Sequence, residues 1–174
     1  FGGYVVGLAT AIGGGTIRDV MLGLPPFWMT NSIYLVCTAM ALILVIVLKD
    51  VISRLSNTWF IFDTLGLALF TIAGIQKTVY AGFPFWVAIV MGCITGAAGG
   101  VIRDVLINEV PVIFRKEIYA MACILGGLIY YVCTLLQINV EITVLISFMS
   151  VVTVRLLAVK YHISLPHLTE ENKQ

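Results

Sequence analysis

Two pairs of adjacent charged residues are the clearest candidates for chemistry in this sequence. Arg18-Asp19 and Arg103-Asp104 each lie within an otherwise apolar stretch. A charge at bilayer depth costs about 2.5–3.5 kcal/mol on insertion scales, so such residues usually face a partner or a hydrated cavity. Neighbouring positions on a helix point about 100° apart, and we therefore expect each residue to find its partner on another helix. The alternative is that the arginines extend to lipid headgroups from the last helical turns.

Composition identifies the environment of these charges. Of 174 residues, 60% are hydrophobic and 11% are charged, whereas a soluble domain carries about 25% charged residues. The sequence therefore predicts an all-α integral membrane protein and excludes soluble folds and secreted disulfide scaffolds. The net charge of +1 argues against a nucleic-acid partner, because such proteins usually carry a basic stripe.

Six stretches are long and apolar enough to span a bilayer as helices, which requires about 20 residues each. They cover residues 2–23, 28–48, 59–75, 83–107, 118–136 and 142–159, with short connections and a polar tail. Lys49, Arg54, Arg115, Lys116 and Lys160 fall on one side of these alternating spans, and the other side holds little beyond Lys77. Lys/Arg-rich loops face the cytoplasm, which predicts a multi-pass membrane protein with a cytoplasmic C-terminus.

An internal repeat is evident at an offset of 85 residues. Residues 7–34 align without gaps on residues 92–119, and 11 of the 28 pairs are identical, including GGxIRDV, a later proline and Ile-Tyr. The chain crosses the membrane three times between the copies, so the second copy must be inverted relative to the first. Inverted repeats recur in transport proteins, whose sites lie where the repeats meet.

The repeat also predicts the domain organisation. The span over residues 59–75 precedes the second copy, and its counterpart would lie before Phe1. We expect two inverted three-helix bundles plus a final helix, with six of seven spans present. The predicted units are 1–58 (the rest of repeat 1), 59–137 (repeat 2), 138–162 (the final helix) and 163–174 (a cytoplasmic tail).

Glycines mark the helices that would carry the site. Small residues recur every four positions in both copies, a spacing that lets helices approach closely. Consecutive glycines also weaken a helix, which favours a kink or break beside a water-filled path over a role in packing alone. The predicted pore and kink residues are Gly13, Gly14, Gly15, Thr16, Gly96, Gly99 and Gly100.

A polar network is predicted from the charges that lie in or beside the spans. Its members are Arg18, Asp19, Asp63, Lys77, Arg103 and Asp104. For Asp63 the alternative is a charge at a helix N-terminus, and for Lys77 an interfacial anchor. Tyr34 and Tyr119 are interpreted as part of an aromatic belt.

No catalytic constellation is present in the sequence. Both histidines lie in the C-terminal segment, and GxSxG, HExxH and P-loop motifs are absent. Cys37, Cys93, Cys123 and Cys133 lie in apolar stretches without CxxC spacing and are expected to pack as small hydrophobic residues. We therefore expect neither an enzyme, nor a metal site, nor a cofactor.

The doubled motif resembles the trimeric intracellular cation (TRIC) channel family, in its prokaryotic branch, which overlaps bacterial glycine-transporter-domain proteins. The similarity rests on Gly13 to Asp19 with Pro26 and Tyr34, and on Gly99 to Asp104 with Pro111, Arg115-Lys116-Glu117 and Tyr119. It implies seven helices, a homotrimer in the lipid bilayer of a prokaryotic plasma membrane and a pore in each subunit. Ala98 departs from the pattern by replacing the third glycine of the second copy.

Two functions follow as expectations. The first is a potassium-permeable monovalent cation channel with its pore between the glycine-kinked helices, through which potassium or sodium ions permeate and to which lipid can bind. The alternative is a secondary transporter of a small amino acid such as glycine, with alternating access. Because a bare arginine disfavours cations, we expect carboxylates to neutralise Arg18 and Arg103.

Overall fold

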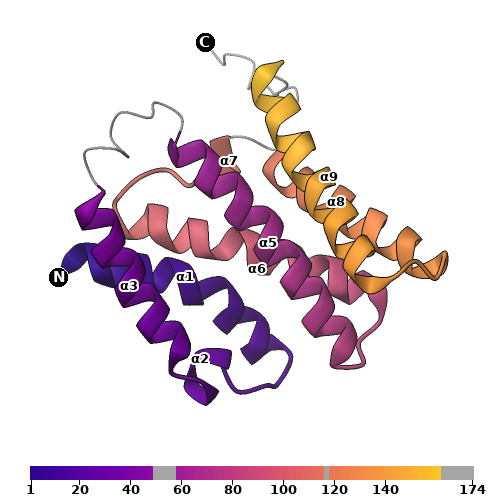
Figure 1. The fold of residues 1–174 in the computed structure, drawn as a ribbon, viewed down its shortest axis with the longest axis horizontal. Coiled ribbons are helices and arrows are strands. Elements are labelled where there is room, and N and C mark those ends of the chain that lie inside the picture. The colour runs from indigo at the N-terminus through magenta and orange to yellow at the C-terminus, as the bar shows by residue number, and fades with distance from the viewer. Residues whose placement is uncertain (49–57, 116–117, 162–174) are drawn as a thin grey trace, which may run out of the picture.

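The computed structural model describes residues 1–48, 58–115 and 118–161, which fold into helices alone (Figure 1). The predicted polar tail and the basic residues Lys49, Arg54 and Lys116 lie outside these described residues. The helices are α1 (Gly2–Met21), α2 (Phe27–Thr30), α3 (Ile33–Val47), α5 (Thr58–Tyr80), α6 (Phe85–Leu106), α7 (Val112–Arg115), α8 (Ile118–Leu135) and α9 (Val140–Lys160). The protein is an all-α integral membrane protein.

Helix lengths and surface composition fit a bilayer. In the described ranges, Phe60–Tyr80, Phe85–Leu106 and Val140–Lys160 are long and apolar enough to cross a membrane, and Ile33–Val47 and Tyr119–Leu135 are shorter apolar helices. Large apolar side chains are exposed along these helices, as on Met40 and Leu145. Such a surface is stable against lipid, where no water has to be ordered around it.

The two repeats are inverted. Figure 1 shows α2 at the bottom of the view and α7 toward the top, with α3 and α5 crossing between these ends and α6 running across the view beside α1. Helix α1 ends beside α2 and α6 ends beside α7, so α1 and α6 run in opposite directions while they pack against each other. This arrangement confirms the prediction that was based on the odd number of crossings.

Local hydrogen bonds repeat with the same offset as the sequence. The N–H of Leu24 donates to the carbonyl oxygen of Asp19, and the N–H of Glu109 donates to that of Asp104, both at 2.8 Å. The preceding residues adopt the left-handed conformation, with φ of 70° at Gly23 and 60° at Asn108. Asparagine tolerates this region better than most residues, which explains how the second copy ends its helix without glycine.

The glycines bring the backbones of α1 and α6 into contact. A Cβ atom on Gly14 would overlap the carbonyl oxygen of Thr95, and one on Gly99 would overlap that of Thr10. Both helices run without interruption through these positions. The expected helix break is therefore not found, because both helices keep their backbone hydrogen bonds. Since glycine has no side chain, these positions instead let α1 and α6 approach each other closely.

Two predicted spans have different bounds in the structure. The stretch that was expected from residue 28 is divided, because Asn31 is extended between α2 and α3, where its side-chain oxygen accepts the N–H of Ile33 at 2.9 Å. The span predicted to end at residue 75 continues to Tyr80. Lys77 allows this extension because its charge is paired inside the protein with Asp19.

Helix α9 lies outside the repeats and packs on α5 and α8 (Figure 1). Val151 of α9 is fully buried in a core with Leu67 and Ala68 of α5 and Ala122 and Cys123 of α8. Cys133 is also buried. At these two positions the cysteines pack as the small hydrophobic residues that the sequence predicted.

We predict that Gly14→Ala and Gly99→Ala each lower the thermal unfolding midpoint of the purified protein. The added methyl groups meet backbone, which cannot move aside as a side chain would, and overpacking costs about 1–3 kcal/mol. Gly7→Ala is the matched control on α1, since nothing lies within 4 Å of its Cβ position. Equal midpoints for Gly14→Ala and Gly7→Ala would show that the backbone contact is not needed.

Candidate functional site

A buried carboxylate organises the end of α1. Asp19 is fully buried, and its Oδ1 accepts a hydrogen bond from Arg18 Nε at 2.8 Å and forms an ion pair with Arg18 Nη2 at 2.7 Å. Its Oδ2 accepts from Lys77 Nζ of α5 and from the N–H of Phe27, each at 2.9 Å. One carboxylate thus connects α1 to α2 and to a helix of the second repeat.

The second copy repeats this geometry at the other end of the molecule. Asp104 Oδ1 accepts a hydrogen bond from Arg103 Nε at 2.8 Å and forms an ion pair with Arg103 Nη2 at the same distance, and Oδ2 accepts the N–H of Val112 at 3.0 Å. Arg103 also approaches α5, with its Nη1 3.4 Å from Asp63 Oδ1. Carboxylates therefore neutralise both arginines, in agreement with the prediction.

The expectation that adjacent arginine and aspartate do not pair is wrong in both copies. The angle of about 100° between neighbours separates their Cβ atoms, but the arginine stem is long enough to bring its guanidinium back around the helix end. The aspartate then still has a second oxygen free for the next element. Arg18 is buried and the side chain of Arg103 is 11% exposed, so both arginines are held by carboxylates of the protein instead of extending to headgroups.

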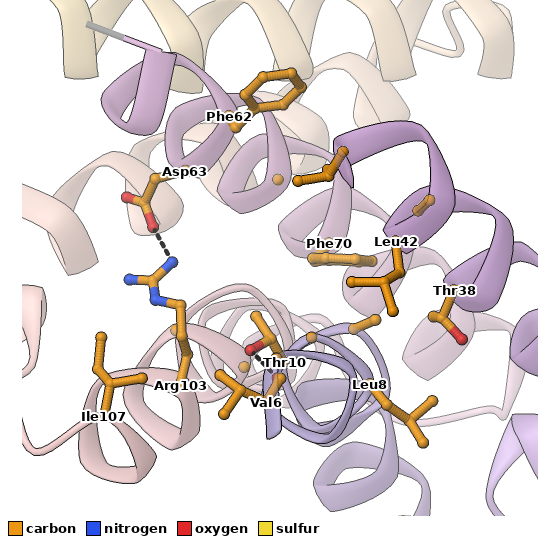
Figure 2. A pocket seen from close by; sticks show the side chains of 18 of the residues that line it. Val6, Leu8, Thr10, Thr38, Leu42, Phe62, Asp63, Phe70, Arg103 and Ile107 are labelled. Carbon is orange, nitrogen blue, oxygen red and sulfur yellow. Dashed lines mark hydrogen bonds and ion pairs between the residues drawn. The ribbon is translucent and has the colours of Figure 1, made fainter. Parts of the chain in front are cut away.

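A cavity of about 570 Å³ opens between α1, α3, α5 and α6. Figure 2 shows Asp63 and Arg103 facing each other on one side of it, while Phe70 and Leu42 lie together on the other. Most of the wall is apolar, and the charged side chains gather where α5 begins and α6 ends. The lining includes Val6, Gly7, Thr10, Ala11, Gly96, Gly99, Gly100, Arg103 and Tyr119.

A second cavity, of about 250 Å³, lies toward the C-terminal ends of α1 and α5. Its wall includes Gly14, Gly15, Arg18 and Tyr34, which the sequence repeat aligns with Gly99, Gly100, Arg103 and Tyr119 of the first cavity. Lys77 and Phe27 complete its polar and aromatic sides. The two cavities are thus built from equivalent residues of opposite repeats.

Three residues line both cavities. Thr10 and Ala11 of α1 and Phe70 of α5 belong to both walls, beside the contact between α1 and α6. The hydroxyl of Thr10 donates to the carbonyl oxygen of Val6 at 2.7 Å, so that it is engaged with its own helix. The two cavities therefore adjoin each other at these shared residues.

The predicted residues divide between these cavities and their supports. Gly96, Gly99, Gly100, Asp63 and Arg103 line the first cavity, and Gly14, Gly15, Arg18 and Lys77 line the second. Gly13 and Thr16 are not among the lining residues of either cavity in the described part of the chain. Gly13 faces the Ile102 side chain, and the Thr16 hydroxyl accepts from Trp28 Nε1 at 3.0 Å.

Sequence reasoning missed Arg155 of α9. Its Nη2 lies 3.1 Å from Asp63 Oδ2, and its guanidinium packs 4.5 Å from the ring centre of Tyr119. Tyr119 is buried rather than in an aromatic belt, which corrects that interpretation. The signal was present, since an arginine within an apolar span is by itself a candidate functional residue.

Among the described residues, no group of three or more histidine, cysteine, aspartate or glutamate side chains is arranged to hold a metal ion. The fold and the cavities define a multi-pass helical membrane protein whose two inverted repeats meet at a partly polar interface. The chain belongs to the glycine transporter family, whose family model matches residues 1–50 and 60–134.

Relatives and solved structures agree with this assignment. The UPF0126 inner membrane protein YadS of Escherichia coli strain K12 is 40% identical over 173 residues, which cover 95% of this chain and 82% of that protein. A TRIC cation channel matches with a TM-score of 0.85 and 29% identity over 97% of this chain and 84% of its own. The TRIC orthologue from Rhodobacter sphaeroides matches with a TM-score of 0.79 and 29% identity over 89% of this chain and 80% of its own.

We predict that Asp19→Asn lowers the free energy of unfolding by about 3–5 kcal/mol, because it leaves Arg18 and Lys77 without their buried carboxylate. Thermal and denaturant unfolding of the purified protein in detergent measure the change. Glu141→Gln is the matched control, since Glu141 is exposed at the start of α9. Similar losses for the two variants would refute the role given to Asp19.

Proposed function

We propose that this protein is a channel for monovalent cations, with a path through each subunit between α1 and α6. The observation that carries the proposal is the pair of cavities that share Thr10, Ala11 and Phe70. They lie toward opposite ends of two antiparallel helices, so widening the shared region would join them into a continuous path. This is the arrangement expected when inverted repeats form a transport route at their interface.

Charge supports cations as the permeating ions. A bare arginine in a narrow apolar path would repel cations, but Arg18 and Arg103 are each held by a carboxylate within 2.8 Å. Asp63 adds a further carboxylate to the wall of the first cavity. The solved structures that this chain resembles are TRIC cation channels, and we extend that property to this chain, with potassium as the main ion.

The proposal includes the assembly and the orientation. One matched structure is a trimeric channel, and we propose a homotrimer with a path in each subunit. The excess of lysine and arginine on the side of the membrane that holds the C-terminus supports a cytoplasmic C-terminus. The first cavity then opens toward the cytoplasm, because Asp63 and Arg103 lie at the helix ends on that side.

The alternative is a secondary transporter of a small amino acid. The description of the family as a glycine transporter favours it, and a cavity of about 570 Å³ is large enough for such a solute. A carrier would expose the same cavities alternately instead of joining them.

Planar bilayer recordings of the purified protein separate these two functions. Unitary current steps, with a reversal potential near that of potassium under a KCl gradient, are expected for a cation channel. Saturable uptake of labelled glycine into vesicles, without current steps, would instead establish the carrier. Reversal near the chloride potential would contradict cation permeation.

We predict that Ala11→Phe lowers the unitary conductance by roughly tenfold, because a ring in an apolar constriction excludes water and ions. Phe70→Ala is expected to raise conductance, since it removes a ring from the same region. Leu69→Ala is the matched control on α5, because Leu69 is exposed and its neighbour Phe70 lines the cavities. Unchanged conductance in both Ala11→Phe and Phe70→Ala would place the ion path elsewhere.

A further inference from the structure

Arg155 is a fully enclosed charge outside the repeats. It lies on α9 with 2% of its surface exposed, and its guanidinium packs 4.5 Å from the ring centre of Tyr119 and 5.2 Å from that of Phe60. Its charged partner is Asp63, at 3.1 Å. Arg155 is not among the lining residues of the first cavity, whereas Asp63 and Tyr119 are.

Asp63 is therefore held from two sides. Oδ1 faces Arg103 Nη1 at 3.4 Å within the cavity wall, and Oδ2 faces Arg155 Nη2 at 3.1 Å behind it. The hydroxyl of Tyr119 lies 3.5 Å from Oδ1. Of the two arginines that face Asp63, the closer one is Arg155, which an ion in the cavity would not contact.

We propose that Arg155 is a specificity-determining residue, which sets the charge balance at the mouth of the first cavity from behind its wall. The proposal rests on the channel function proposed above. Arg103 and Arg155 balance Asp63 and Asp104, so these four charges sum to zero. Because little water lies between a buried charge and the cavity, its field reaches a passing ion with weak screening.

This charge balance determines the direction in which each substitution is expected to change the potassium-to-chloride permeability ratio. Arg155→Gln leaves one surplus negative charge, with Arg103 still beside Asp63, and is expected to raise the potassium-to-chloride permeability ratio by roughly three- to tenfold. Asp63→Asn leaves one surplus positive charge, because arginine stays protonated in proteins, and is expected to lower the ratio to a similar degree. The double variant Asp63→Asn/Arg155→Gln is expected to return close to the ratio of the unchanged protein.

The experiment measures reversal potentials under a KCl gradient for the reconstituted full chain. Lys160→Gln is the matched control, since it removes the same charge from an exposed position of α9. At about 0.15 M salt a surface charge is screened within about 8 Å, so no shift is expected. Arg155→Lys preserves the charge and is expected to keep most of the selectivity.

A second pair of variants tests the effect of the Arg155 charge on selectivity in case the single variant is unstable. If Arg155→Gln alone fails to fold, Asp63→Asn is compared with Asp63→Asn/Arg155→Gln, where removing both partners avoids an unpaired buried charge. The proposal requires the double variant to be the more cation-selective of these two. Equal reversal potentials in that comparison, or an Arg155→Gln shift no larger than that of Lys160→Gln, would overturn it. Absence of ion conduction in the unchanged protein would instead overturn the proposed channel function.

Discussion

Neutralisation of charge inside a bilayer is the constraint on which the rest of the structure depends. Asp19 and Asp104 meet it with the same geometry: one carboxylate oxygen holds the preceding arginine and the other holds the N–H that begins the next short helix. A buried carboxylate left without such partners would be costly. The Arg-Asp pair therefore fixes where each long helix ends and how the chain turns at opposite ends of the molecule.

The structure departs from its internal symmetry where the charges differ. Helix α5 contributes Asp63 near one end and Lys77 near the other, so that the first cavity gains a carboxylate and the second gains an ammonium group. Helix α9 adds Arg155 behind Asp63 alone. Two equivalent cavities thus acquire different electrostatic surroundings from helices outside the matched segments, which would give the proposed path two unlike ends.

The sequence predicted the features that follow from composition and repetition. The apolar stretches located the long helices, and the offset of 85 residues predicted the inverted arrangement. The sequence could not predict the pairing of Arg18 with Asp19, because that pairing depends on the rotamer of the long arginine side chain. The break at Asn31 depends on a local side-chain hydrogen bond, and the burial of Tyr119 depends on α9, which no repeat positions.

The glycines give α1 and α6 a close contact at the same interface where the proposed path lies. Gly14 and Gly99 place each helix against a carbonyl oxygen of the other, without a side chain between them. Where backbone meets backbone, no rotamer change can separate α1 from α6. Joining the two cavities therefore requires either that these helices move apart or that the Phe70 ring turns away from the shared region. Because Asp19 and Asp104 tie the far ends of both helices to other elements, such a movement is most easily accommodated near the middle, where the shared residues lie.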